Sequence, residues 1–360
     1  MLTGEAQSSG KDLAVTDNTG ASRLALEDAY LSEEEAERLL GGRRLSRGDL
    51  VMDPKAQLMG ELIRQQRAPD YIPTPTETRQ QFRRMVELFD EPPPASVVTS
   101  DLSCPGPAGP VPLRLFAPEG GGRVALPLLL YLHGGGWVQG DLDTHQGVCG
   151  KLAAWAGCKV LAVDYRLAPE HSFPAALDDC RAAWRWLAGN TGAVGADPER
   201  LAVGGDLAGG NLAVALCLAM AAEGGPMPAA QMLIYPSLEL GWDLPSHREL
   251  ADAFVLPRPR VLWYTAQYMG ERGQVADPLA SPLRATDLRG QPPAMIATAG
   301  FDPLLDDGRL YAERLEAAGV PVVYREFPGQ IHAFVSLTRV IPQGDVCLHE
   351  LADWLRSRLG

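Results

Sequence analysis

The chain has 360 residues, 46% of them hydrophobic and 21% charged, a composition that supports a large buried core and argues against a disordered or fibrous protein. Its formal net charge of −13 argues against nucleic-acid binding, which needs a basic surface. We see neither a signal peptide nor an apolar run of membrane-spanning length, so we expect a cytoplasmic protein without a membrane span. The six cysteines lack zinc-binding spacing, and we expect free thiols, no metal and no cofactor.

The N-terminal part of the chain predicts helices without strands. Residues 1–27 are polar and contain glycine and serine, and we expect them to be poorly ordered. Ser32, which is followed by glutamates, predicts a capped helix start. Pro54–Gln66 and Pro75–Phe89 have helical patterns, and a run of prolines ends the last of them. We expect this helical segment, residues 28–92, to pack on or beside the main domain.

From Ser96 onward, short apolar runs separated by turn residues predict strands. The expected strands are Val111–Phe116, Ala125–Leu132, Val160–Val163, Leu201–Val203, Met232–Tyr235, Ala294–Thr298 and Val322–Glu326. The expected helices between and after them are Gln146–Ala156, Pro174–Leu187, Ala208–Ala222, Asp307–Ala318 and Asp345–Arg358. Strands that alternate with helices predict an α/β fold with a mostly parallel, doubly wound sheet and helices on both faces.

One segment interrupts this alternation. Between Pro236 and Ala294 the sequence predicts no strand, only turns rich in proline and arginine around one helical pattern, Arg258–Met269. Because an insertion of this length is usually functional, we expect it to serve as a lid.

The segment Gly205–Gly209 has the pattern of a nucleophile elbow. An apolar run feeds a tight glycine turn, and a long helical pattern leaves the turn at Ala208. In the G-x-S-x-G elbow, a strand, a sharp turn and a helix lift one side chain above the sheet. The central residue of that pattern is a serine, whereas this chain has Leu207.

Further motifs follow other predicted strands. His133 and the three glycines after it follow the strand that ends at Leu132, and such loops leave backbone N–H groups free to bind an oxyanion. Asp302 and His332 follow two later strands. Because the carboxyl ends of parallel strands share one edge of a sheet, we expect all these motifs to converge there. The order nucleophile, acid, histidine is that of α/β-hydrolases.

Together these motifs resemble those of the hormone-sensitive-lipase-like esterases, which form bacterial family IV of the α/β-hydrolases. The matching segments are His133–Trp137, Asp164–Glu170, Phe173–Ala176, Gly205–Gly210, Asp302–Asp307 and Gly329–Phe334. The chain departs from the family pattern where Leu207 stands for serine, Ala333 for glycine and Asp307 for glutamate. Only the first of these departures touches the chemistry.

The resemblance implies an α/β-hydrolase fold and a carboxylic ester hydrolase that acts on small to medium acyl esters. The reacting groups that it implies are Asp302 as the acid, His332 as the base and Leu207 in the place of the nucleophile. The oxyanion donors that it implies are the backbone N–H groups of Gly134, Gly135 and Ala208. The implied partner is a small-molecule ester, and a homodimer stays an open alternative.

The resemblance also implies a division of the chain into a cap and a catalytic domain. Residues 28–92 form the N-terminal cap helices, and residues 238–269 form the cap insertion. The catalytic domain then comprises residues 93–237 and 270–360.

Leu207 has no atom that could attack an ester, and loss of the nucleophile costs such a site about a millionfold in kcat. We therefore expect this form to be inactive or nearly so. Position 207 also needs a positive φ, which costs a residue with a Cβ about 1–3 kcal/mol. Two explanations stay open: an active esterase altered at this position, which we favour, and a non-catalytic protein that binds a small ligand. Nucleophilic attack by Asp206 is disfavoured, because Asp206 lies one residue early on a sharp turn.

The remaining polar and aromatic residues of these segments have mainly structural interpretations. We expect first-turn acids of a helix at Asp306 and Asp307, and a hydrogen-bonded brace between Asp164 and Arg166. We expect structural histidines at His133, His145 and His171, and surface histidines at His247 and His349. For Trp137, Tyr264 and Tyr268, two interpretations stay open: the side chains line an acyl pocket, or they pack in the core.

Overall fold

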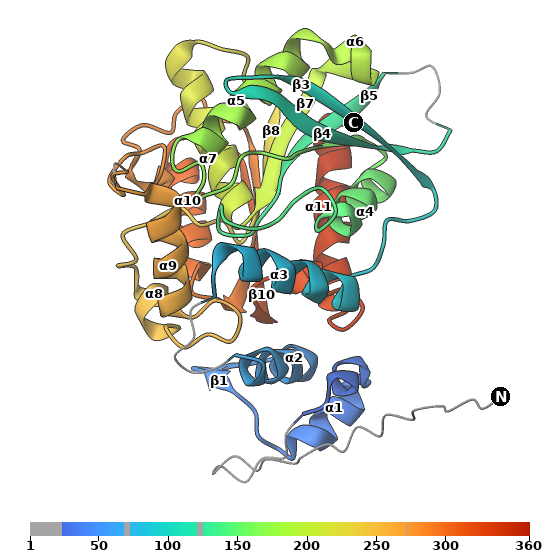
Figure 1. Ribbon diagram of the computed structural model, residues 1–360, viewed down its shortest axis with the longest axis vertical. Helices are drawn as coiled ribbons and strands as arrows, with labels where there is room; N and C mark the ends of the chain where they lie inside the picture. Colours follow the sequence, from blue (N-terminus) through green and yellow to red (C-terminus); the bar gives the residue numbers. More distant parts are fainter. Residues whose placement is uncertain (1–23, 68–72, 121–124, 272) are drawn as a thin grey trace, which may run out of the picture.

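The computed structural model describes residues 24–67, 73–120, 125–271 and 273–360 (Figure 1). Within these ranges, an eight-stranded sheet has the strand order β10-β9-β8-β7-β5-β6-β4-β3. The strands are β3 (Val97–Gly106), β4 (Gly109–Pro118), β5 (Leu126–Leu132), β6 (Lys159–Val163), β7 (Ala196–Asp206), β8 (Ala230–Ile234), β9 (Ala294–Phe301) and β10 (Val322–Ile331). From β5 to β10 all pairs are parallel, whereas β4 pairs antiparallel with both β6 and β3. The predicted mostly parallel α/β sheet is confirmed.

Each strand predicted from the sequence overlaps a strand of this sheet, but the sequence did not predict β3. This strand lies at the edge of the sheet, and Cys104 is its only buried residue. Its hydrogen bonds to β4 hold it in place, so it carries no apolar periodicity that a sequence pattern could reveal. A two-stranded hairpin, β1 (Ser46–Arg47) and β2 (Leu50–Val51), was also not predicted.

Helices cover both faces of the sheet, as predicted. On one face lie α4 (Gln146–Ala156) and α11 (Gln343–Leu359). On the other face lie α5 (Ala175–Gly189), α6 (Thr191–Val194), α7 (Ala208–Glu223) and α10 (Leu305–Ala317). The central strand β5 contributes side chains to the apolar layers on both faces of the sheet. Leu128 and Leu130 point to one face, and Leu129 and Tyr131 point to the other.

The N-terminal helices begin where the sequence predicts. They are α1 (Glu33–Leu40), α2 (Pro54–Gln65) and α3 (Pro75–Phe89), preceded by the short 3-10 helix η1 (Leu26–Tyr30). The Ser32 hydroxyl accepts the N–H of Glu35 and caps α1. The expected poor order of residues 1–27 lies largely outside the described residues, but it is wrong for residues 24–27. Leu24 is buried and donates its N–H to Gln65 Oε1.

The predicted insertion between β8 and β9 contains no strand in its described residues. It holds α8 (Pro245–Glu249), α9 (Arg258–Met269) and the 3-10 helix η2 (Pro282–Arg284), and η3 (Phe334–Ser336) follows β10. In the view of Figure 1, α3 crosses the lower end of the sheet, α2 lies below α3, and α8 and α9 lie to the left. The guanidinium of Arg67 joins α2 to the insertion, because it donates to the carbonyl oxygens of Phe254 and Val255. In the described ranges, no helix has both the length and the apolar character needed to cross a bilayer.

Candidate active site

Residue 207 sits at a sharp turn between β7 and α7. Leu207 has φ +50° and ψ −110°, a conformation that residues with a Cβ rarely adopt. Its N–H donates to the carbonyl oxygen of Ile234 on the neighbouring strand, at 3.0 Å. The turn also needs a glycine at 209, because a Cβ there would lie 1.8 Å from the carbonyl oxygen of Leu132. This is the strand–turn–helix geometry expected of a nucleophile elbow.

His332 and Asp302 form a buried pair at the carboxyl ends of β10 and β9. His332 Nδ1 lies 2.7 Å from Asp302 Oδ2, and Asp302 Oδ1 accepts the N–H of Leu304 at 3.0 Å. Asp302 is fully buried, so its carboxylate is fixed by these contacts rather than by water. The Nε2 atom of His332 has no hydrogen-bond partner among the described residues, which leaves it free to exchange a proton with a group in the adjacent cavity.

The glycine loop is tied down by Asp206. The side chain of Asp206 is buried, and its Oδ1 accepts the N–H of Gly134 at 2.9 Å and the hydroxyl of Tyr131 at 2.8 Å. His145 Nε2 lies 3.4 Å from the same oxygen. Burial disfavours the carboxylate, but the His145 charge and these hydrogen bonds outweigh it and lower the pKa of Asp206. The carboxylate therefore anchors the loop, consistent with the expectation that it is no nucleophile.

The N–H of Gly134, which was expected to be an oxyanion donor, already donates to Asp206. The N–H groups of Gly135 and Gly136 have no acceptor among the described residues. The same holds for the N–H of Ala208, which opens helix α7 and so lacks an intrahelical partner. Gly136 was missed from the sequence because three consecutive glycines look alike until the contact to Asp206 separates them.

A cavity of about 540 Å³ lies over this edge of the sheet. His332, Leu207 and Gly135 line it from the sheet. The apolar side chains that line it from the helices and the insertion include Leu26, Met59, Leu62, Ile63, Phe82, Met85, Leu88, Phe89, Val255 and Leu256. The cavity is therefore built from the two segments expected to form a cap together with the sheet edge that carries His332.

The structure separates the three aromatic residues whose role the sequence left open. Tyr264 lines the cavity. Trp137 and Tyr268 are buried and stack on each other, with ring centroids 4.3 Å apart and planes 4° from parallel. They pack in the core beneath the glycine loop.

The expected brace between Asp164 and Arg166 is not formed. The Arg166 guanidinium instead binds both oxygens of Asp179, at 2.8 and 2.9 Å. The Asp164 carboxylate forms no hydrogen bond or ion pair with a described residue. Burial and the neighbouring carboxylates of Asp141 and Asp143 raise the pKa of Asp164 to about 6.

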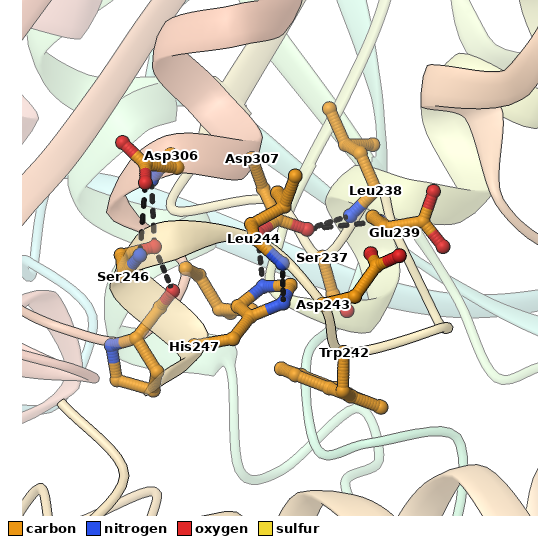
Figure 2. Close-up of polar contacts among 12 residues, drawn as sticks. Ser237, Leu238, Glu239, Trp242, Asp243, Leu244, Ser246, His247, Asp306 and Asp307 are labelled. Carbon is orange, nitrogen blue, oxygen red and sulfur yellow. Dashed lines mark hydrogen bonds and ion pairs between the residues drawn. The ribbon is translucent and has the colours of Figure 1, made fainter. Parts of the chain in front are cut away.

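His247 was expected at the surface, but it is buried and paired with Asp307 (Figure 2). Its Nε2 lies 2.6 Å from Asp307 Oδ2, and its Nδ1 accepts the N–H of Leu244. Asp307 Oδ1 also accepts the N–H groups of Leu238 and Glu239, so this carboxylate ties the insertion to α10. The first-turn placement of Asp306 and Asp307 in α10 is confirmed.

Ser246, His247 and Asp307 do not form a second triad. The Ser246 hydroxyl donates to the Pro303 carbonyl oxygen and accepts the N–H of Asp306, as Figure 2 shows. Both ring nitrogens of His247 are also occupied. The cluster is a structural clamp.

The other histidines follow the expectations except His171, which was expected to be structural but is exposed. His133 is buried, stacks on Tyr165 and contacts the Gly134 carbonyl oxygen at 2.8 Å, so it braces the glycine loop. His171 and His349 are exposed. Burial, followed by the charge of His145, lowers the pKa of His133 to about 4. In the described part of the chain, no three His, Cys, Asp or Glu side chains gather as a metal site.

Comparisons with known proteins agree with this geometry. A protein family described as the alpha/beta hydrolase fold matches residues 129–336. The carboxylic ester hydrolase LipN of Mycobacterium tuberculosis is 44% identical over 273 residues, which are 74% of this chain and 72% of LipN. The ethyl acetate hydrolase of Pseudomonas putida is 38% identical over 79% of this chain and 90% of its own length.

Solved structures extend the similarity to the backbone. An ester hydrolase from the metagenome of Lake Arreo, complexed with a bipyridine phosphonate derivative, is 40% identical, with a TM-score of 0.81. The match covers 85% of this chain and 97% of that protein. The chain belongs to the α/β-hydrolase family and has the scaffold of its hormone-sensitive-lipase-like esterases.

Proposed function

We propose that this chain is a carboxylic ester hydrolase whose chemical step is blocked at residue 207. The observation that carries the proposal is the buried His332–Asp302 pair. His332, whose Nε2 is free, lines the same cavity as Leu207. A general base, its orienting carboxylate and unpaired N–H donors are the parts that acyl transfer needs besides a nucleophile.

With a serine at 207, the reaction follows from these positions. The serine hydroxyl attacks the ester carbonyl while His332 Nε2 takes its proton, and Asp302 holds the imidazole in the required tautomer. The N–H groups of Gly135, Gly136 and Ala208 stabilise the oxyanion. His332 then returns the proton to the leaving alcohol, and water attacks the acyl-enzyme by the same route in reverse.

In the form described here, Leu207 offers no hydroxyl and no proton for His332. The form is therefore inactive or nearly so, while the cavity remains able to hold an ester. We propose that residues 28–92 and 238–269 act as the cap over the cavity, because both segments contribute lining side chains.

Leu207→Ser tests this proposal, with Leu207→Ala as the matched control that removes the leucine but adds no nucleophile. We expect the serine variant to hydrolyse short-chain 4-nitrophenyl esters at least 1000-fold faster than the alanine variant, a conservative part of the about millionfold that a nucleophile contributes. Asp302→Asn in the serine background should lower kcat by up to about 10⁴-fold, because the imidazole loses its tautomer. A folded serine variant without hydrolysis above the alanine control would refute the proposal.

A second candidate function is a non-catalytic protein that binds a small ligand in this cavity. The observation in its favour is Leu207 itself, which is partly buried and packs against both core layers. This candidate predicts a ligand that binds the leucine form more tightly than Leu207→Ser. Calorimetry on both forms separates the two candidates.

A further inference from the structure

The cap side of the cavity carries positive charge that no described acid compensates. Arg67, just beyond α2, and Arg260, in α9, line the cavity, and the exposed Arg84 of α3 does so too. None of the three forms an ion pair with a described residue. Among the described residues that line the cavity, Asp206 is the only one with a carboxylate, and it is already bound to the glycine loop.

Two of these arginines also have unused hydrogen-bond donors. Arg67 Nη2 donates to the carbonyl oxygens of Phe254 and Val255. The Nε and Nη1 atoms of Arg67 have no acceptor among the described residues. Arg260 uses Nε on the Tyr264 hydroxyl at 3.1 Å and packs over that ring, which leaves both Nη atoms. These contacts hold each guanidinium in place while its remaining donors stay available to a ligand.

Arg67 also experiences the positive charge of Arg260. Burial, followed by the charge of Arg260, lowers the pKa of Arg67. Two partly buried cations in one apolar cavity are unfavourable unless an anion joins them, and a guanidinium binds a carboxylate or phosphate with two parallel hydrogen bonds. No residue in the described ranges supplies that anion, although the net charge of the chain is −13.

We propose that the cavity selects an ester that carries an anionic group, bound by Arg67 and Arg260, at the end remote from its scissile carbonyl. The arginines belong to the cap segments, whereas His332 and Leu207 lie at the sheet edge, so the anion and the ester carbonyl contact different parts of the cavity lining. Apolar side chains of α2 and α3 lie in the same lining and suit the chain between them. As a statement about substrate, this inference rests on the proposed ester hydrolysis.

The anion site can be tested without any turnover, by calorimetry on the leucine form. The probes are monomethyl adipate, the neutral dimethyl adipate, and pentyl phosphate. We expect monomethyl adipate to bind about tenfold or more tightly than dimethyl adipate, and its affinity to fall with added salt. Tighter binding of pentyl phosphate than of monomethyl adipate would support the site and assign it to a phosphate instead of a carboxylate.

Arg67→Gln and Arg260→Gln should each weaken the anionic probe about tenfold and leave the neutral diester within about twofold. Arg64→Gln is the matched control, since Arg64 is exposed in the last turn of α2, lies over the Phe254 ring and does not line the cavity. Retained affinity for the diester shows that a variant is folded. Equal binding of the charged and neutral probes, or an equal effect of Arg64→Gln, would overturn the inference.

The Leu207→Ser background supplies the second measurement. There, kcat/KM for the 4-nitrophenyl monoester of adipic acid should exceed that for 4-nitrophenyl hexanoate, and Arg260→Gln should reverse this order. If the serine variant hydrolyses neither ester, the proposed function fails, while calorimetry still decides whether the arginines bind an anion. If it hydrolyses both equally, with or without Arg260, the substrate inference fails and the esterase stands.

Discussion

The backbone N–H of Gly134 donates to Asp206 Oδ1 at 2.9 Å, so the residue beside the nucleophile position fixes the glycine loop. The contact arises because β5 and β7 are neighbours in register, with Leu132 opposite Gly205. Asp206, the last residue of β7, therefore lies beside the loop that follows β5. One carboxylate oxygen then holds the start of the oxyanion loop against the elbow.

Asp206→Ala should destabilise the protein by about 3–5 kcal/mol, because it strands the Gly134 N–H and the Tyr131 hydroxyl in a buried site. Asp206→Asn should cost less, since an amide oxygen still accepts both hydrogen bonds. Urea unfolding of the three proteins at pH 7 measures this order. Equal stability of the alanine and asparagine variants would show that Asp206 does not anchor the loop.

Leu207→Gly should be more stable than Leu207→Ala by about 1 kcal/mol, the reverse of the usual order of these residues. Both variants lose the same isobutyl group, so their comparison isolates the backbone. At φ +50° a Cβ is strained, whereas glycine is not. Thermal and urea unfolding provide the comparison. Alanine equal to or more stable than glycine would mean that the turn carries no strain.

Asp164→Asn should stabilise the protein at neutral pH. The folded-state pKa of Asp164 is raised to about 6, so the fold disfavours the ionised form and loses stability as pH rises from about 4 to about 6. The asparagine variant escapes this loss, which we put at about 1–2 kcal/mol after allowing for solvent around the partly exposed carboxylate. Unfolding midpoints should differ most above pH 6.5 and converge towards pH 4.5. A difference independent of pH would contradict this account.

His247→Ala should destabilise the protein by about 3–5 kcal/mol, because it leaves the Asp307 carboxylate buried without its partner. His349→Ala is the matched control, since this exposed histidine stacks on Trp155 without a buried charge and should cost less than about 1 kcal/mol. Because Asp307 also binds the backbone of residues 238 and 239, the His247 variant should show faster proteolysis of the insertion. Similar losses of stability in the two variants would show that the His247–Asp307 pair is not a structural clamp.

Much of the sheet could be predicted because its strands are buried on both faces and read as continuous apolar runs. Helix starts at Ser32, Pro54 and Pro75 could be predicted because capping residues act locally. The edge strand β3 could not, since its backbone pairing with β4 does not depend on an apolar pattern. His247 could not be placed either, because its burial depends on Asp307, which lies 60 residues away in the chain.

The sequence by itself determined the α/β sheet, the order of the motifs and the positions of Leu207, Asp302 and His332. These features depend on local pattern and on the rule that parallel strands end at one edge. Only the tertiary structure decided which glycine N–H groups are free, that Arg166 pairs with Asp179, and that Arg67 and Arg260 line the same cavity. Each of these outcomes is a contact between segments far apart in the chain, and such contacts follow from strand register and cap packing rather than from neighbouring residues.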